Sequence, residues 1–218
     1  MRTRISRLLL PALLVVTSLA AYGGWAAITV EDLPDYGVAR QPLSLTFTVR
    51  QHGVTLLNRL EPRVEAAGGG ATIAATAQPE SEPGRYTARL VLPQAGDWRI
   101  TIRSGFMASR VTLLPLPVVE AGAAAPPTPA AGARGEALFV AKGCVTCHLH
   151  REVSGSGVVA VGPELTGRRW PAEYLVRFLK DPSIGPQYGS SRMPNLNLKD
   201  AEVAALIAFL NGEPRASR

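Results

Sequence analysis

Residues 120–133 separate two parts of this chain that have different hydrophobic periods. The stretch reads E-A-G-A-A-A-P-P-T-P-A-A-G-A and has too few large apolar side chains to pack into a core. Apolar residues alternate before it and recur at helical spacing after it. At about 3.1 Å per residue the stretch could reach roughly 40 Å. The 218-residue sequence therefore predicts two small domains joined by a proline- and alanine-rich linker, on which the second domain could swing.

The first domain is expected at 25–119, where apolar and polar side chains alternate as they do in half-buried strands. The alternation is clearest over 42–50, over 85–92 and from Trp98 to Ile102. Turn residues separate these runs and no convincing helix lies between them, so the pattern favours an all-β, immunoglobulin-like sandwich.

The stretch from Gly84 to Trp98 in this domain resembles immunoglobulin-like periplasmic domains of the FixH-like and YtkA-like kind. Copper sites need several soft ligands, and this segment offers only His52 and Met107. We therefore expect no copper site in the sandwich and interpret it as a docking or spacer module.

The second part contains Cys144-Val145-Thr146-Cys147-His148, a C-x-x-C-H sequence. Two thiols three positions apart can reach the two vinyl groups along one edge of a porphyrin, and the next residue then lies under the iron. The motif predicts one covalently attached haem c, with thioethers from Cys144 and Cys147 and His148 as an iron ligand.

Three other uses of these cysteines fit the sequence less well. Zinc would need further ligands at comparable spacing, whereas the chain has no third cysteine and only His52 and His150 besides His148. A thioredoxin-like pair belongs at the end of a strand in a βαβ unit, which nothing before Cys144 resembles. A disulfide would close a very small loop and contribute little stability.

The order of motifs over about 133–214 resembles the small class I c-type cytochromes. It comprises Gly135-x-x-x-Phe139, the C-x-x-C-H sequence, Gly162-Pro163-Glu164-Leu165-Thr166-Gly167, Arg192-Met193-Pro194 and a closing apolar helix. The resemblance implies an all-α cytochrome c fold over 134–218. Hydrophobic spacing predicts helices over 135–142, 171–180 and 201–210. In the family the first and last helices cross, which would bring Gly135 and Phe139 against Leu206 and Phe209.

The sequence also predicts where the last helix begins and whether His150 is exposed. The last helix lacks a serine or threonine where related sequences have one, and Asn197 is the candidate N-cap in its place. His150 lies two residues from His148 and cannot reach the opposite face of the haem, so we expect it to be solvated.

The apolar face of the middle helix, with Tyr174 and Phe178, is expected to form one wall of the haem crevice.

Met193 is the predicted sixth iron ligand, because it is the only methionine of this domain and a thioether favours ferrous iron. The resemblance implies that the carbonyl of Pro163 accepts a hydrogen bond from the imidazole of His148, which would fix the ring. It also implies contacts to the haem from Leu165, Arg168 and Trp170. Arginines near the propionates could hold them, although a solvated basic turn explains the same residues.

The N-terminus has the layout of a secretory signal over 1–20, with three arginines before an apolar run. A cleaved signal peptide is favoured over an uncleaved anchor because the uninterrupted run is short for a membrane span. Haem attachment to C-x-x-C-H occurs outside the cytoplasm, so both features predict a periplasmic or extracytoplasmic protein, with possible membrane association through this segment. Without 1–20 the net charge falls from +6 to about +3, which gives no case for nucleic acid.

The expected function is electron transfer by a monohaem carrier rather than catalysis. Its expected partners are an unidentified redox donor and acceptor and the cytochrome c maturation machinery. One alternative is an electron-entry haem subunit of a periplasmic oxidoreductase or copper oxidase. Another is a haem-based sensor or a peroxidase-like enzyme, which needs a vacant or easily lost sixth position.

Overall fold

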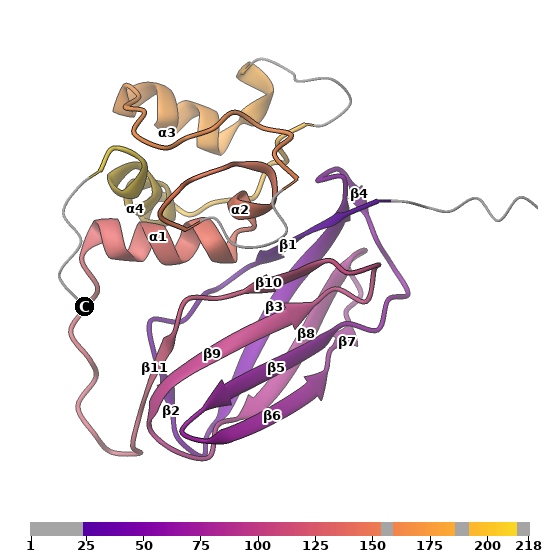
Figure 1. Cartoon of the computed structure of the whole chain (residues 1–218), viewed down its shortest axis with the longest axis vertical. Coiled ribbons are helices and arrows are strands. Elements are labelled where there is room, and N and C mark those ends of the chain that lie inside the picture. The colour runs from indigo at the N-terminus through magenta and orange to yellow at the C-terminus, as the bar shows by residue number, and fades with distance from the viewer. Residues whose placement is uncertain (1–23, 154–158, 186–191, 213–218) are drawn as a thin grey trace, which may run out of the picture.

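A computed structural model describes residues 24–153, 159–185 and 192–212, and it divides them into a β part and a helical part (Figure 1). The predicted signal segment, 1–20, lies outside the described residues. The order of the elements agrees with the two-domain architecture expected from the sequence, with all strands before all helices.

The β part consists of two sheets. In the first sheet the strand order is β1 (Ala26–Val30), β3 (Pro42–Gln51), β8 (Arg85–Val91) and β7 (Gln78–Pro79), with β4 (Thr55–Leu56) paired to β3. In the second the order is β2 (Gly37–Val38), β11 (Leu116–Val119), β9 (Gly96–Arg103), β5 (Arg63–Gly68) and β6 (Ala71–Thr76), with β10 (Arg110–Thr112) paired to β9. Strands β2 and β11 are parallel, and the other pairs are antiparallel.

The alternation seen in the sequence sets which side chains enter the core between the sheets. The predicted strands over 42–50, 85–92 and 98–102 are confirmed as β3, β8 and β9. Their inward side chains are almost fully buried: Leu45, Phe47, Val49, Tyr86, Ala88, Leu90, Trp98, Ile100 and Ile102.

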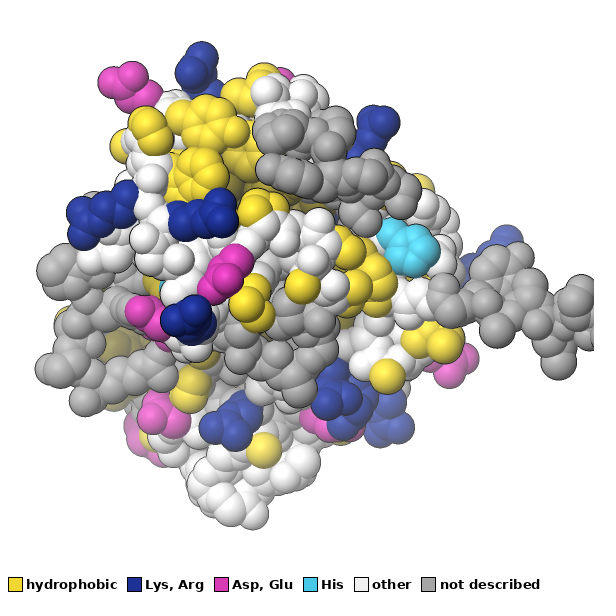
Figure 2. Space-filling view, turned by 45° about the horizontal axis from the view of Figure 1, so that its top comes forward, with side chains coloured by type: hydrophobic (Ala, Val, Ile, Leu, Met, Phe, Trp, Pro, Cys, Tyr) yellow, Lys and Arg dark blue, Asp and Glu magenta, His cyan; other side chains and the backbone are white. Residues whose placement is uncertain are grey.

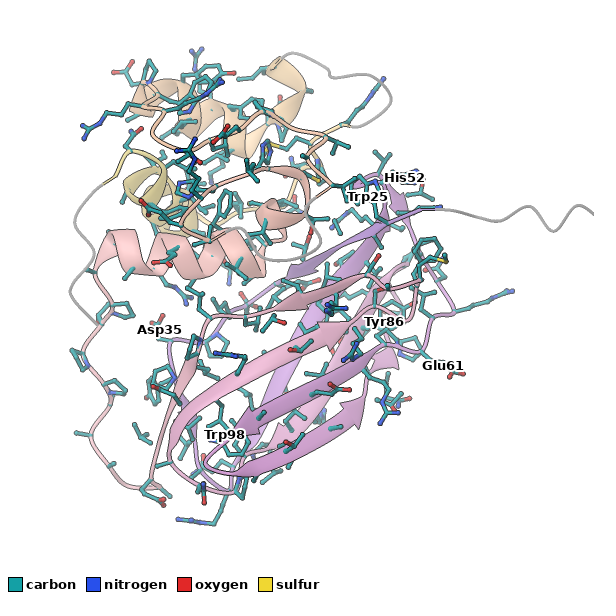
Figure 3. The ribbon with its side chains drawn as sticks, in the orientation of Figure 1. Trp25, Asp35, His52, Glu61, Tyr86 and Trp98 are labelled. Carbon is teal, nitrogen blue, oxygen red and sulfur yellow. The ribbon has the colours of Figure 1, made fainter. Side chains whose placement is uncertain are left out.

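Two large aromatic residues in this core, Tyr86 and Trp98, form hydrogen bonds through their polar atoms. Both are labelled in Figure 3. The Tyr86 hydroxyl donates to the carbonyl of Leu57 at 2.8 Å and accepts from the Leu60 amide at 3.1 Å. The Trp98 indole N–H donates to the carbonyl of Gln94 at 3.0 Å. Both rings are therefore buried with their polar atoms hydrogen-bonded.

The helical part contains four α-helices and one 3-10 turn among the described residues. These are α1 (Ala131–Ala141), α2 (Cys144–Cys147), α3 (Ala172–Lys180), η1 (Pro182–Ile184) and α4 (Asp200–Leu210). Helix α1 begins at Ala131, inside the segment assigned to the linker, because small alanine and glycine residues are compatible with a helix that packs on a neighbour.

Helix α4 begins at Asp200, and its N-cap is Lys199 rather than Asn197, so that expectation is wrong. The backbone amide of Lys199 donates to the Glu202 carboxylate at 2.9 Å. Glu202 therefore plays the part of the glutamate in a capping box, although the N-cap residue is not serine or threonine. Asn197 lies before the helix with a φ of 50°.

The predicted crossing of the first and last helices is confirmed as a contact between α1 and α4. A Cβ atom on Gly135 would lie 1.9 Å from the carbonyl oxygen of Ala205, so only glycine permits this approach. The rings of Phe139 and Phe209 pack with centroids 5.4 Å apart.

His150 is buried beside this crossing, with 5% of its surface exposed, so the expectation that it is solvated is wrong. Its ring centroid lies 4.6 Å from that of Phe209 and 5.6 Å from that of Phe139. A turn begins at His150, where the Val153 amide donates to the His150 carbonyl at 3.0 Å. The spacing from His148 could not show that the His150 imidazole would pack on the two phenylalanine rings.

The helical part packs directly on the β part and is not held away from it by the linker. In Figure 1, α1 lies beside β1 and β10. Val140 and Ala141 of α1 belong to the same buried apolar cluster as the sandwich core, and Leu33 packs against the clusters of both parts. The swinging domain inferred from linker composition is therefore corrected to a packed pair of domains, because burial of apolar surface at this interface opposes separation.

Ion pairs surround this apolar contact. Arg134 on α1 lies 3.0 Å from Asp35 of the β part, and Lys199 before α4 pairs with Asp32. The guanidinium of Arg134 also donates to the carbonyl of Leu33. These contacts join both crossing helices to the segment that follows β1.

Candidate functional site

An apolar cavity lies between the helices and the adjoining edge of the β part. Its walls come from α1, α2, α3, α4, the segments around Pro163 and Met193, and the β part near β1. Seven of the eight predicted cofactor residues line it: Cys144, Cys147, His148, Pro163, Leu165, Trp170 and Met193. Arg168 is exposed and does not line the cavity.

The two cysteines stand one helical turn apart on α2 and are both free thiols. Helix α2 follows Gly143, whose φ is 80°, and a Cβ atom there would lie 2.5 Å from the carbonyl oxygen of Ile28 in β1. A glycine is thus required both by the left-handed backbone and by the close strand. Burial raises the pKa of the Cys144 thiol to about 12 and that of the Cys147 thiol to about 11.

The imidazole of His148 is held by the backbone of the segment that follows α2. Its Nδ1 lies 2.9 Å from the carbonyl oxygen of Pro163, and because a carbonyl can only accept, Nδ1 carries the proton. Burial lowers the pKa of His148, so the ring is neutral and Nε2 keeps its lone pair. A Cβ atom on Gly162 would lie 2.4 Å from His148 Cε1, so glycine at 162 makes room for the ring.

Three aromatic rings form a row along α3 and its N-terminal end. The ring centroids of Trp170 and Tyr174 are 6.3 Å apart, and those of Tyr174 and Phe178 are 5.6 Å apart with an interplanar angle of 11°. All three line the cavity, as expected for Tyr174 and Phe178. Figure 2 shows hydrophobic side chains gathered on the face that carries α3, with Lys and Arg side chains around them.

Trp170 is fixed to the end of α4 by a residue that the sequence did not single out. The Asn211 side chain accepts from the Trp170 amide at 3.0 Å and donates to its carbonyl at 3.1 Å. A lone asparagine after an apolar helix is a common C-terminal feature, so no sequence pattern distinguishes this role.

The β part supplies five cavity residues that sequence reasoning missed as site residues: Trp25, Ala27, Thr29, His52 and Gly53. They belong to β1, to the residue before it and to the turn between β3 and β4. Lys142, at the end of α1, also lines the cavity. No local pattern connects these residues with the C-x-x-C-H sequence, because only the packing of the two parts brings them together.

The donor set and the apolar lining of the cavity fit a covalently bound haem c. Two unpaired thiols, an imidazole with an available Nε2 and a thioether all line one mainly apolar cavity. This combination of imidazole and sulfur ligands with two nearby thiols matches the ligands of c-type haem iron.

The described part of the chain has no helix of the length and apolar character needed to cross a membrane.

A comparison with protein families finds one match, over residues 130–210, to the model described as "Cytochrome C oxidase, cbb3-type, subunit III". The matched residues include every helix from α1 to α4. None of the curated proteins compared with this chain matches its sequence.

Solved structures give only distant likenesses. The E. coli alpha-2-macroglobulin has 16% identity, covers 43% of this chain and 6% of that chain, and has a TM-score of 0.36. Domains 4 and 5 of the S-layer protein SbsC have 20% identity, cover 42% of this chain and 44% of that chain, and have a TM-score of 0.30. A superoxide reductase (neelaredoxin) variant from Ignicoccus hospitalis has 12% identity, covers 46% of this chain and 86% of that chain, and has a TM-score of 0.30. TM-scores of this size do not establish a shared fold.

The family match supports a c-type cytochrome domain in the C-terminal part of the chain, joined to an all-β N-terminal part.

Proposed function

We propose that this chain is an extracytoplasmic electron-transfer protein that carries one haem c with histidine and methionine as axial ligands. The observation that carries the proposal is that Cys144, Cys147, His148 and Met193 line the same apolar cavity. When bound, the haem supplies one-electron chemistry by cycling between ferrous and ferric iron. The protein supplies attachment, ligands and a low-dielectric surrounding.

Each residue has a distinct role in this proposal. Cys144 and Cys147 attach the haem, and Nε2 of His148 is the proximal ligand. The bond to Pro163 orients the imidazole and raises its basicity as a donor. Met193 is the sixth ligand, and its thioether favours the ferrous state.

The remaining predicted residues shape the surroundings of the haem. Leu165 and Trp170 supply apolar wall. Arg168 is exposed and lies outside the cavity walls. Its guanidinium could bind a haem propionate only if that propionate extended to the protein surface.

The proposal describes a carrier and not an enzyme, with a redox donor and acceptor as partners and the cytochrome c maturation machinery as the attachment system. Covalent haem of this kind is attached outside the cytoplasm, which supports a periplasmic location. Export would rest on 1–20, where a cleaved signal peptide is favoured and an uncleaved anchor is the alternative.

The absorption spectrum of the purified, matured protein tests the proposal. A pyridine haemochrome assay should count one haem per chain, and the ferric protein should show the weak band near the red edge that a sulfur ligand gives. Met193→Ala should abolish that band and let the ferrous protein bind carbon monoxide, whereas wild type should bind it poorly. Ready binding of carbon monoxide by wild type would favour a sensor or a peroxidase-like enzyme instead.

A second candidate function is an electron-entry haem subunit of a larger oxidoreductase or copper oxidase. The family description over 130–210 favours it, because that family is named for an oxidase subunit. Co-purification of a stable larger complex after mild detergent extraction would support this candidate. Recovery of the chain alone at its own mass would support the independent carrier.

A further inference from the structure

We infer that the β part completes the haem crevice, with Trp25 and the turn at His52 and Gly53 bracing the segment that carries Met193. This inference rests on the proposed function, since it assigns a task within the haem site. It replaces the interpretation of the sandwich as a spacer or docking module.

Trp25 and His52 lie together at the end of the β part that faces the helices (Figure 3). Trp25 precedes β1, and His52 follows β3, the strand that pairs with β1. The His52 amide donates to the carbonyl of Trp25 at 3.1 Å, and the two ring centroids are 5.6 Å apart. Both residues line the cavity that holds the predicted iron ligands.

The turn beside them approaches both chain neighbours of Met193. A Cβ atom added at Gly53 would lie 3.4 Å from the carbonyl oxygen of Arg192 and 3.9 Å from Cδ of Pro194. Because glycine has no Cβ atom, these distances leave room for about one methyl group between the turn and the two residues that flank the predicted sixth ligand. Movement of this segment toward the β part would bring it against the turn.

The backbone of the turn is itself unusual. His52 has a φ of 52° and Gly53 a φ of 74°, so two successive residues adopt left-handed conformations. A non-glycine residue in this region costs free energy that surrounding contacts must offset. The amide of Val54 donates to the carbonyl of Gln51 at 3.0 Å and closes the turn.

The domain interface keeps this turn in position. Gly143, next to Cys144, lies against the backbone of Ile28 in β1, with no room for a Cβ atom. Residues at the other end of the interface are held by the ion pair between Arg134 and Asp35. The wall formed by the β part is therefore tied to the haem-attachment segment by direct backbone contact.

Two consequences follow for a haem in this cavity. An added apolar wall excludes water and favours the less charged ferrous state, which raises the reduction potential. A braced Met193 segment opens less often, so an external ligand competes less well for the sixth position.

The test uses the full-length, haem-loaded protein with Trp25→Ala, and Val54→Ala as the matched control. Val54 lies in the same turn, is 50% exposed and does not line the cavity. Loss of the aromatic contact should speed carbon monoxide binding to the ferrous protein by about fivefold and lower the reduction potential, at unchanged haem content. Val54→Ala should match wild type in both measurements.

A second variant covers the case in which Trp25→Ala fails to fold. His52→Gly removes the ring from an exposed side chain and suits the left-handed backbone, so the protein should fold and show changes of the same sign. Variants that match Val54→Ala in both measurements would overturn the inference. Loss of the sixth ligand in His52→Gly but not in Met193→Ala would also overturn it, because His52 would then ligate iron directly.

The outcomes separate this inference from the proposed function. A wild-type protein without haem, or with a sixth position open to carbon monoxide, contradicts the proposed function itself. A six-coordinate wild type whose Trp25 and His52 variants behave identically contradicts only the role given to the β part.

Discussion

Lys142 and Glu202 form an ion pair, with Nζ and Oε1 2.8 Å apart, at the point where α1, α4 and the β part meet. Their side chains are only 3% and 11% exposed. The ammonium of Lys142 also donates to the carbonyl of Glu31. The backbone carbonyl of Lys142 accepts from the Thr29 hydroxyl at 3.4 Å. A residue two positions before Cys144 thus ties both crossing helices to the strand that borders the cavity.

We predict that Lys142→Met lowers the free energy of unfolding of the haem-loaded protein by about 3–5 kcal/mol, because it leaves the Glu202 carboxylate buried without its partner. The double variant Lys142→Met with Glu202→Leu should recover most of that loss. Lys180→Met is the control, since Lys180 pairs with Asp200 on the surface and its loss should cost at most about 1 kcal/mol. Urea unfolding measures all three, and equal losses for the single and double variants would contradict the buried pair.

Cleavage of the linker should leave the two parts associated. A protease site placed between Ala123 and Pro129 would cut an exposed stretch, while the apolar contact and ion pairs of the interface remain. We expect the cleaved, haem-loaded protein to elute at the volume of the intact chain in size-exclusion chromatography. Two separate peaks at micromolar concentration would instead support a freely moving haem domain.

The thiols should be unreactive in a folded chain that lacks haem. Burial raises the pKa of Cys144 from 9.0 to about 12, so its thiolate fraction at pH 8 falls about a thousandfold. Because the folded state holds this proton more tightly, the resulting stability is present below pH 9 and is lost as the pH rises toward 12.

Alkylation followed by mass spectrometry measures this reactivity at Cys144. The haem-free chain should react slowly when folded and rapidly in urea, with the folded rate increasing with pH up to about 12. Matured protein should not react in either condition, because thioethers do not release a thiol on unfolding. Rapid labelling of the folded chain at pH 8 would show that the pKa of the Cys144 thiol is not raised.

Gly135→Ala gives a prediction in which two effects have opposite signs. Helix propensity alone would stabilise α1 by about 1 kcal/mol. The new methyl group would clash with the carbonyl of Ala205, so we expect a net loss of about 1–3 kcal/mol. Ala204→Leu, at an exposed position of α4, serves as the control and should be nearly neutral. A stabilised Gly135→Ala protein would show that the two helices are further apart.

Local patterns were sufficient for the longest strands and helices. Alternation located β3, β8 and β9, because a strand with one buried face must present an apolar residue at every second position. Helical spacing located α3, and Pro171 marked its start. The same reasoning missed the start of α1, whose first residues are alanine and glycine and carry no hydrophobic period.

The linker and His150 show where composition misleads. A proline- and alanine-rich stretch indicates that the stretch itself does not pack, yet it says nothing about the affinity of the two surfaces that it joins. Likewise, the spacing of His150 from His148 excludes ligation on the opposite face but not burial against Phe139 and Phe209.

The sequence by itself determined the chemistry of the candidate site, because attachment of a porphyrin needs two thiols and an imidazole at fixed short separations, and Cys144, Cys147 and His148 lie within five residues of one another. Tertiary structure alone decided that Trp25, His52 and Gly53 share the cavity with Met193. Met193 follows Gly53 by 140 positions and Trp25 by 168 positions in the chain. Their contact depends on how two independently patterned surfaces fit together, and no short-range rule of spacing or propensity encodes that fit.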